Sequence, residues 1–239
     1  MVPVEVFFYS WIFSCVGRDN TIVVTYLLSS TRNSERCSMM TQKDFFNSMA
    51  EMWDTACHHN TNKIKYILNL LNTKNGSRIL DVGTGTGILV PFLSEKVGIQ
   101  GEITAIDFAN KMIEVAQRKY EYGNVSFICD NVFEVDFPNK YFDFIICYSV
   151  FPHFEDKQSA INILSKYMKD GGKLAICHSQ SREAINNLHK KVSKVVEEDN
   201  LPTIDVIKGY FKNSNLKIIV EIDNDEMFVI VASKMNRLI

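Results

Sequence analysis

The sequence has no excess of charge of one sign. Its 26 basic and 28 acidic residues give a formal net charge of −2 at pH 7. Proteins that follow a nucleic-acid backbone normally carry a basic stripe. The charge balance therefore argues against a nucleic-acid partner and favours a small-molecule one.

The sequence also lacks any pair of cysteines with Cys-x-x-Cys spacing. The six cysteines stand at positions 15, 37, 57, 129, 147 and 177. Three of them, Cys129, Cys147 and Cys177, lie in apolar runs, where a free thiol packs as a small hydrophobic side chain. We therefore expect reduced thiols and a cytoplasmic protein.

No long hydrophobic run marks the beginning of the sequence. The aromatic stretch at residues 6–13 is too short to cross a bilayer, and it follows Glu5 rather than a basic segment. We expect neither a signal peptide nor a membrane span. Residues 1–40 do not share the pattern of the rest: they are interpreted either as an extension upstream of a natural start at Met39 or Met40, which we favour, or as a hydrophobic interaction arm.

A glycine-rich turn is the most informative feature that is present. Residues 78–87 read RILDVGTGTG, so that an apolar run leads into Gly83, Gly85 and Gly87. Alternating glycines let the backbone turn sharply and approach a ligand, and a helix that follows presents free N–H groups. The dinucleotide fingerprint Gly-x-Gly-x-x-Gly is not met, because Ile88 takes the place of its third glycine.

Polar side chains follow each of the next β-prone runs. The runs are residues 101–107, ending in Asp107; 125–131, ending in Asp130 and Asn131; and 142–149, ending in Tyr148 and Ser149. In a doubly wound sheet, ligands bind at the carboxyl ends of the strands, where an acid can accept from both ribose hydroxyls. Asp107 is the candidate for that role, whereas Asp130 could equally be a turn residue that ends its strand.

Apolar residues at helical spacing alternate with these runs. They are Ile64, Ile67, Leu68 and Leu71; Met112, Val115 and Ala116; Ile161, Leu164 and Met168; and Ile185, Leu188, Val192 and Val195. Residues 216–222 and 227–232 flank a short polar turn and must therefore pair antiparallel. The pattern predicts an α/β fold whose last two strands form a hairpin.

The form Asp-x-Gly-x-Gly-x-Gly resembles motif I of the class I S-adenosylmethionine-dependent methyltransferases. The resemblance begins near Phe45 and is closest to the ubiquinone/menaquinone C-methyltransferase-like subgroup, through residues 46–54 and 109–116. It implies a doubly wound, Rossmann-like, seven-stranded sheet, mostly parallel with an antiparallel C-terminal hairpin. It also implies a methyltransferase domain at residues 41–239, with N-terminal lid helices at 41–75 and the core at 76–239.

The resemblance assigns S-adenosylmethionine as cofactor and a small molecule as methyl acceptor. The residues that it implies for the cofactor are Gly83, Gly85 and Gly87 for the aminocarboxypropyl group, with Thr84 between them; Asp81 for the loop; Asp107 for the ribose; Phe108 and Met112 for the adenine; and Asp130 with Asn131 for its amine.

The acceptor side has three catalytic candidates, Tyr148, His153 and His178, at the ends of neighbouring strands. Both histidines, expected at the exposed edge, could act as bases near neutral pH, or could be ordinary hydrogen-bonded loop residues. Trp53 could be core or could cover the cofactor. The Cys57-His58-His59 segment could contribute to a metal site, but adjacent histidines are weak evidence, and we expect no metal.

Two other functions stay open. The first is a non-catalytic S-adenosylmethionine-binding sensor or partner protein. The second, less favoured, is an NAD-dependent oxidoreductase, against which the glycine spacing and the predicted hairpin both count. The sequence determines neither the methylated atom nor the oligomeric state.

Overall fold

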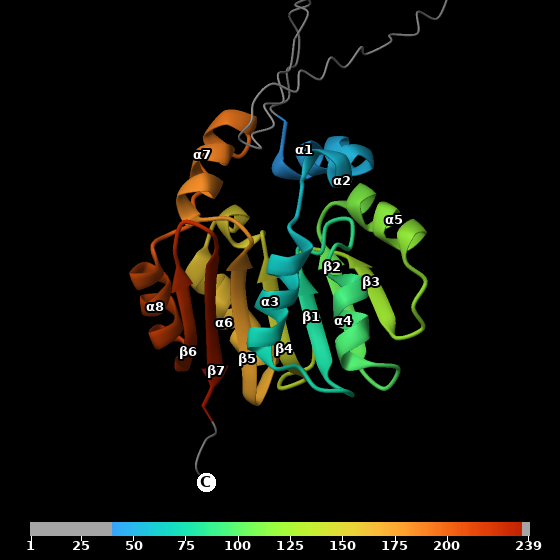
Figure 1. The fold of residues 1–239 in the computed structure, drawn as a ribbon, viewed down its shortest axis with the longest axis vertical. Helices are drawn as coiled ribbons and strands as arrows, with labels where there is room; N and C mark the ends of the chain where they lie inside the picture. Colours follow the sequence, from blue (N-terminus) through green and yellow to red (C-terminus); the bar gives the residue numbers. More distant parts are fainter. Residues whose placement is uncertain (1–39, 236–239) are drawn as a thin grey trace, which may run out of the picture. The chain divides into compact units, whose positions relative to one another are not determined.

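A seven-stranded sheet forms the centre of the computed structural model, which describes residues 40–235 (Figure 1). Its strands are β1 (Arg78–Val82), β2 (Glu102–Asp107), β3 (Val125–Cys129), β4 (Phe142–Tyr148), β5 (Met168–His178), β6 (Leu216–Asp223) and β7 (Phe228–Lys234). They lie in the order β3-β2-β1-β4-β5-β7-β6. The first five pair in parallel, and β7 runs antiparallel to both β5 and β6. This confirms the predicted doubly wound sheet and its C-terminal hairpin.

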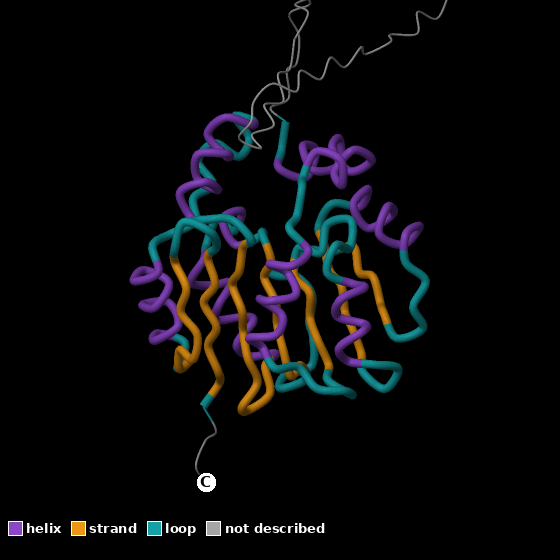
Figure 2. The backbone as a smooth tube through the Cα atoms, in the orientation of Figure 1, coloured by secondary structure: helices purple, strands orange, loops and turns teal. Residues whose placement is uncertain are grey.

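Helices precede and follow the strands, as Figure 2 shows by colour. They are α1 (Gln42–Met49), the 3-10 turn η1 (Ala50–Met52), α2 (Trp53–Ala56), α3 (Thr61–Leu71), α4 (Val90–Val97), α5 (Asn110–Lys119), the 3-10 turn η2 (Phe151–His153), α6 (Lys157–Tyr167), α7 (Arg182–Val192) and α8 (Ile204–Asn213). Within residues 40–235, no helix has the length and apolar character needed to cross a bilayer.

The two faces of the sheet bury alternate residues of each strand, as the period of two requires. Ile79 of β1 packs in a cluster with α3 and α4, whereas Leu80 and Val82 pack in a second cluster with α6 and α8. Both clusters are almost wholly apolar, and strands buried on both faces are typical of parallel sheets. The cores therefore hold the sheet between two layers of helices.

Five details differ from the sequence prediction or were absent from it. Met168 begins β5, where it pairs with Phe142, so it does not continue the preceding helix. The apolar residues that follow β5 at helical spacing form a helix only as far as Val192, where α7 ends, because the backbone of Ser193 is extended. Cys129 is exposed because β3 is an edge strand. Helix α8 had not been predicted, and no helix connects β3 to β4.

The N-terminal extension, Cys15 and Cys37 lie outside the described residues. Helix α3 packs on the sheet, so we use the word lid for α1, η1 and α2 only, residues 42–56. The proposed boundary between lid and core stays a prediction.

Gly83 is a position at which the fold requires glycine. Its φ is +69°, and a Cβ built there would lie 2.3 Å from Cγ2 of Val150. We expect Gly83→Ala to lower the free energy of unfolding by about 2 to 4 kcal/mol, from the left-handed backbone and the overpacking together. Urea denaturation measures this change.

The matched control is Gly209→Ala in α8, where a Cβ would meet nothing within 4 Å. This variant should be more stable than the wild type by about 0.5 to 1 kcal/mol, because alanine is the better helix former. Equal effects of the two substitutions would contradict the steric argument.

Candidate functional site

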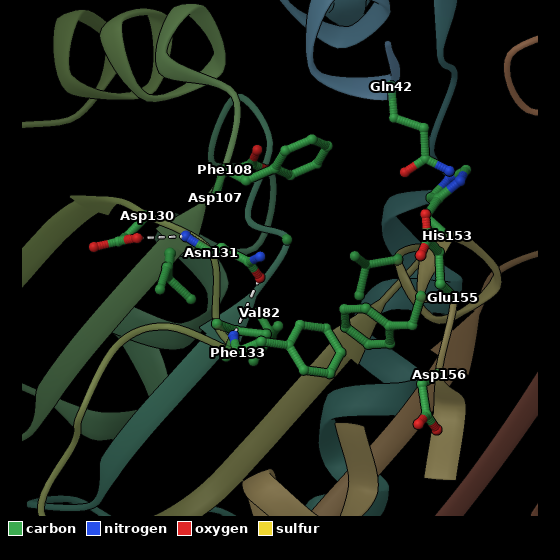
Figure 3. A pocket seen from close by; sticks show the side chains of 15 residues that line it. Gln42, Val82, Asp107, Phe108, Asp130, Asn131, Phe133, His153, Glu155 and Asp156 are labelled. Carbon is green, nitrogen blue, oxygen red and sulfur yellow. Dashed lines mark hydrogen bonds between the residues drawn. The ribbon is translucent and has the colours of Figure 1, made fainter. Parts of the chain in front are cut away.

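A cavity of about 420 Å³ opens at the carboxyl ends of β1, β2 and β3 and beside the loop after β4 (Figure 3). Its lining residues are Gln42, Val82, Gly83, Ile106, Asp107, Phe108, Asp130, Asn131, Val132, Phe133, Val150, His153, Phe154, Glu155 and Asp156. After β1 the chain adds β2 and β3 on one side of the sheet, and after β4 it adds β5 on the other side. The cavity therefore lies at the switch point of the sheet. Its size suits a small organic ligand.

The glycine turn forms one wall of this cavity. Gly83, Gly85 and Gly87 all have positive φ, at 69°, 56° and 83°. Gly83 lines the cavity directly, whereas Gly85 and Gly87 do not. The indole Nε1 of Trp53 lies 3.7 Å from the position that a Cβ of Gly85 would take, which agrees with Trp53 as a lid residue.

Asp107 joins the turn to the end of β2. One carboxylate oxygen accepts from the backbone N–H of Gly85 and the other from that of Ala109, both at 2.9 Å. The residue is 8% exposed and lines the cavity. Burial raises the pKa of this carboxyl, and the backbone hydrogen bonds offset part of that rise.

Asp81 lies beneath the turn and outside the cavity lining. Its carboxylate accepts from the hydroxyl of Thr84 at 2.7 Å, and both residues are buried. This hydrogen bond ties the turn back to β1. Burial raises the pKa of Asp81 to about 7, although the Thr84 hydroxyl counteracts it.

The predicted adenine residues separate into two groups. Phe108, Asp130 and Asn131 line the cavity. Asn131 is held in place because its side-chain oxygen accepts from the N–H of Phe133 at 3.1 Å, and its own N–H donates to Asp130 (Figure 3). Met112 instead lies in an apolar cluster with the lid and does not line the cavity. Its contact with adenine stays a prediction.

His153 is the catalytic candidate that lines the cavity. Its Nδ1 lies 2.7 Å from a carboxylate oxygen of Asp199, and its side chain is 13% exposed. Phe46 of the lid packs edge-on against the imidazole, with ring centroids 5.1 Å apart. The ring is therefore fixed from two sides.

His178 and Tyr148 are buried and do not line the cavity. His178 is 2% exposed, so the expectation of an accessible side chain is wrong. Burial lowers its pKa to about 3, which keeps it neutral at neutral pH, and its Nε2 has no hydrogen-bond partner. The Tyr148 hydroxyl donates to Ser179 at 2.8 Å and lies 2.9 Å from Nδ1 of His59. Burial raises the pKa of Tyr148.

The Cys57-His58-His59 segment does not form a metal site with its neighbours. Nδ1 of His59 is hydrogen-bonded with the Tyr148 hydroxyl, and burial raises the pKa of the Cys57 thiol to about 12. Across residues 40–235, no group of three or more His, Cys, Asp or Glu side chains converges to hold a metal ion.

The lid closes over the turn through polar contacts that had not been predicted. Thr86 donates to Asp54 of α2, which also pairs with Lys119 of α5 at 2.6 Å. Gln42 at the start of α1 donates to Asp199. Asp199 lies far from every motif in the sequence, so no local signal could have identified it.

The raised pKa of Asp81 predicts how stability depends on pH. The folded state holds the Asp81 proton up to about pH 7, whereas the unfolded state loses it near 3.8. Its contribution to stability is therefore complete below pH 3.8 and is lost as the pH rises through 7. The quantity to compare is the free energy of unfolding of Asp81→Asn minus that of the wild type. We expect this difference to be ~2 to 3 kcal/mol larger at pH 8 than at pH 5.

Urea denaturation at the two pH values measures this difference. The control is Asp225→Asn, in the exposed turn between β6 and β7, which should show no such change. If the stability of Asp81→Asn relative to wild type is the same at both pH values, Asp81 is already ionised in the folded protein at pH 5.

Comparison with known proteins gives the family of this chain. The family described as "Methyltransferase domain" matches residues 73–224. A ubiquinone/menaquinone biosynthesis C-methyltransferase of Vibrio parahaemolyticus is 33% identical over 116 residues, which are 47% of this chain and 45% of the relative. Its counterpart from Vibrio cholerae is 28% identical over 167 residues, 66% of this chain and 64% of the relative. The first of these matches thus spans about half of each protein.

Solved structures share the fold. A SAM-dependent methyltransferase from Aquifex aeolicus has a TM-score of 0.62 at 20% identity, covering 78% of this chain and 97% of its own. A phosphoethanolamine N-methyltransferase from Haemonchus contortus, in complex with S-adenosyl-L-methionine, has a TM-score of 0.61 at 17% identity. The match covers 74% of this chain and 53% of that structure's chain. The sheet order, the glycine turn and the family match agree: the chain belongs to the class I S-adenosylmethionine-dependent methyltransferases.

Proposed function

We propose that the protein transfers a methyl group from S-adenosylmethionine to a small-molecule acceptor. The observation that carries this proposal is the cavity at the switch point, which is bounded by Gly83 of the turn and by the buried carboxylate of Asp107. An approachable backbone and an acid at the end of β2 are the two features that a nucleoside-containing ligand needs at this place.

The proposed cofactor contacts follow from the lining. A carboxylate offers about four lone-pair sites, so Asp107 can accept from ribose hydroxyls in addition to the N–H groups of Gly85 and Ala109. Asp130 and Asn131 supply acceptors for the adenine amine, and Phe108 supplies an aromatic face. Gly85, Gly87 and Thr84 would shape the turn behind these contacts.

The chemistry asks little of the protein beyond positioning. S-Adenosylmethionine supplies a methyl group that is already activated. The chain's residues must hold the acceptor in line with that group, exclude water and remove a proton where the acceptor has one. The lid and the aromatic rings of Phe133 and Phe154 would exclude water, and His153 is the group that can take a proton at the cavity.

The acceptor is proposed to be a small molecule. The cavity volume of about 420 Å³ and the net charge of −2 both support this class over a nucleic acid. The names of the curated relatives describe C-methyltransferases of quinone biosynthesis, so hydroxylated rings belong in an acceptor screen. The free thiols of Cys57, Cys129, Cys147 and Cys177 support the expected cytoplasmic location.

Calorimetry separates this proposal from its alternatives. Binding of S-adenosylmethionine and of its demethylated product, without binding of NAD, supports the methyltransferase. Tight NAD binding with no response to S-adenosylmethionine would favour an oxidoreductase. Cofactor binding without product from a panel of phenols, catechols, thiols and amines, assayed with methyl-labelled cofactor, would favour the non-catalytic sensor.

Asp107→Ala tests the proposed ribose contact. We expect the dissociation constant for S-adenosylmethionine to rise about 10- to 100-fold, because hydrogen bonds to a charged group contribute about 1.5 to 3 kcal/mol. Calorimetry measures this value, and circular dichroism checks the fold. Glu155→Gln, at the exposed rim of the same cavity, is the control and should bind nearly as well as wild type. An unchanged affinity in folded Asp107→Ala would limit Asp107 to a structural role.

His153→Ala tests proton removal. If His153 is the base, turnover should fall by ~10²- to 10⁴-fold with little change in cofactor affinity. The exposed His58 of the segment after α2 provides the control, His58→Gln, which should retain turnover. Near-normal turnover of His153→Ala would mean that positioning alone drives the reaction. His178, neutral because it is buried, should produce no acid limb in the pH profile.

A further inference from the structure

Asp199, in the segment between α7 and α8, meets three elements at the edge of the cavity. Its side chain is 15% exposed, and one oxygen lies 2.7 Å from Nδ1 of His153. The side-chain amide of Gln42 donates to the two carboxylate oxygens at 3.2 and 3.0 Å. The backbone carbonyl oxygen of Asp199 lies 2.6 Å from Nδ1 of His189. Asp199 is therefore fixed by contacts to both its side chain and its backbone.

The contact with Asp199 bears on which ring nitrogen of a neutral His153 imidazole carries the hydrogen. An ionised carboxylate only accepts hydrogen bonds, so a neutral imidazole beside it carries its proton on Nδ1. The other ring nitrogen, Nε2, then holds a lone pair. Phe46 and His189 pack against the ring, with centroids 5.1 and 4.9 Å from that of His153, so the ring cannot turn freely.

We propose that Asp199 is a positioning residue that keeps His153 in the Nδ1–H tautomer, with Nε2 as the proton acceptor at the cavity. The proposal rests on the methyltransferase function proposed above. It deepens that function because a paired base is useful only for an acceptor that must lose a proton. The acceptor class that it indicates carries a weakly acidic O–H, such as a phenol.

This arrangement provides a place for the proton, the electron pairs and the charge of the methyl transfer. The acceptor's proton passes to Nε2, and the electron pair that held it stays on the acceptor to form the new bond to the methyl carbon. The sulfur keeps the pair of the S–C bond that breaks. His153 becomes a cation, and the adjacent Asp199 carboxylate stabilises it.

Other charged groups near this pair modify the field without replacing Asp199. Lys157 interacts electrostatically with Asp199, while its Nζ donates to the backbone carbonyls of Pro152 and Phe154. Asp107 interacts with His153 across the cavity. His189 is directed to the carbonyl of Asp199 and has a pKa lowered by burial, so it adds little positive charge.

The test observes the imidazole directly and needs no acceptor. Full-length protein labelled with ¹⁵N-histidine is studied at pH 8 by two-bond ¹⁵N–¹H correlation spectra, and His153→Gln assigns the ring. We expect wild-type His153 to show only the Nδ1–H pattern. Asp199→Ala should lose that single pattern and give a mixture of the two tautomers, while Glu198→Gln, which removes the neighbouring exposed acid, should match the wild type.

Asp199→Leu provides a second variant if Asp199→Ala does not fold. The leucine side chain keeps most of the bulk but has no hydrogen-bond acceptor, so a mixture of tautomers is again expected. An Nε2–H pattern in the wild type, or an unchanged pattern in either folded variant, would overturn the role of Asp199. Calorimetry with S-adenosylmethionine runs in parallel: a wild type that fails to bind it refutes the proposed function, whereas the spectra judge Asp199 separately.

Discussion

The buried carboxylate of Asp107 is the constraint on which the rest of the site depends. Removing a carboxylate from water is costly unless hydrogen bonds compensate it. Here the compensation comes from the N–H groups of Gly85 and Ala109, while the carbonyl of Ile106 accepts from Gly83 and Thr84. The backbone carbonyl of Asp107 also accepts from the N–H of Asp130. The glycine turn, the end of β2 and the start of the loop after β3 are thus fixed to two successive residues, Ile106 and Asp107.

The lid has a core of its own, which explains an unexpected role for α5. Phe45, Phe46 and Met49 pack against Met112 and Val115 of α5, so the apolar stripe of that helix serves the lid as well as the sheet. Figure 1 shows α1 and α2 beside α5 above the carboxyl ends of the strands. The cavity itself takes its polar groups from Gln42 of the lid, from the strand ends below and from the loop after β4.

The features that could be predicted from the sequence are those with a local signal. The strands are apolar runs, the glycine turn is a spaced motif, and Asp107 is the last residue of a strand. Other features depend on tertiary position. Cys129 and His178 both end β-prone runs, yet one is exposed on an edge strand and the other is buried beside β7. Asp199 is 46 residues from His153, and only the folded chain brings them together.

The order of the strands has a consequence for the synthesis of the chain. The last strand of the described part, β7, lies between β5 and β6 rather than at an edge of the sheet. Until Phe228–Lys234 has left the ribosome, the edge of β5 that faces away from β4 has no partner in this sheet. Open edges of this kind pair readily with other chains and favour aggregation. A nascent chain can thus complete its glycine turn early, yet it stays vulnerable to wrong pairing until β7 is inserted.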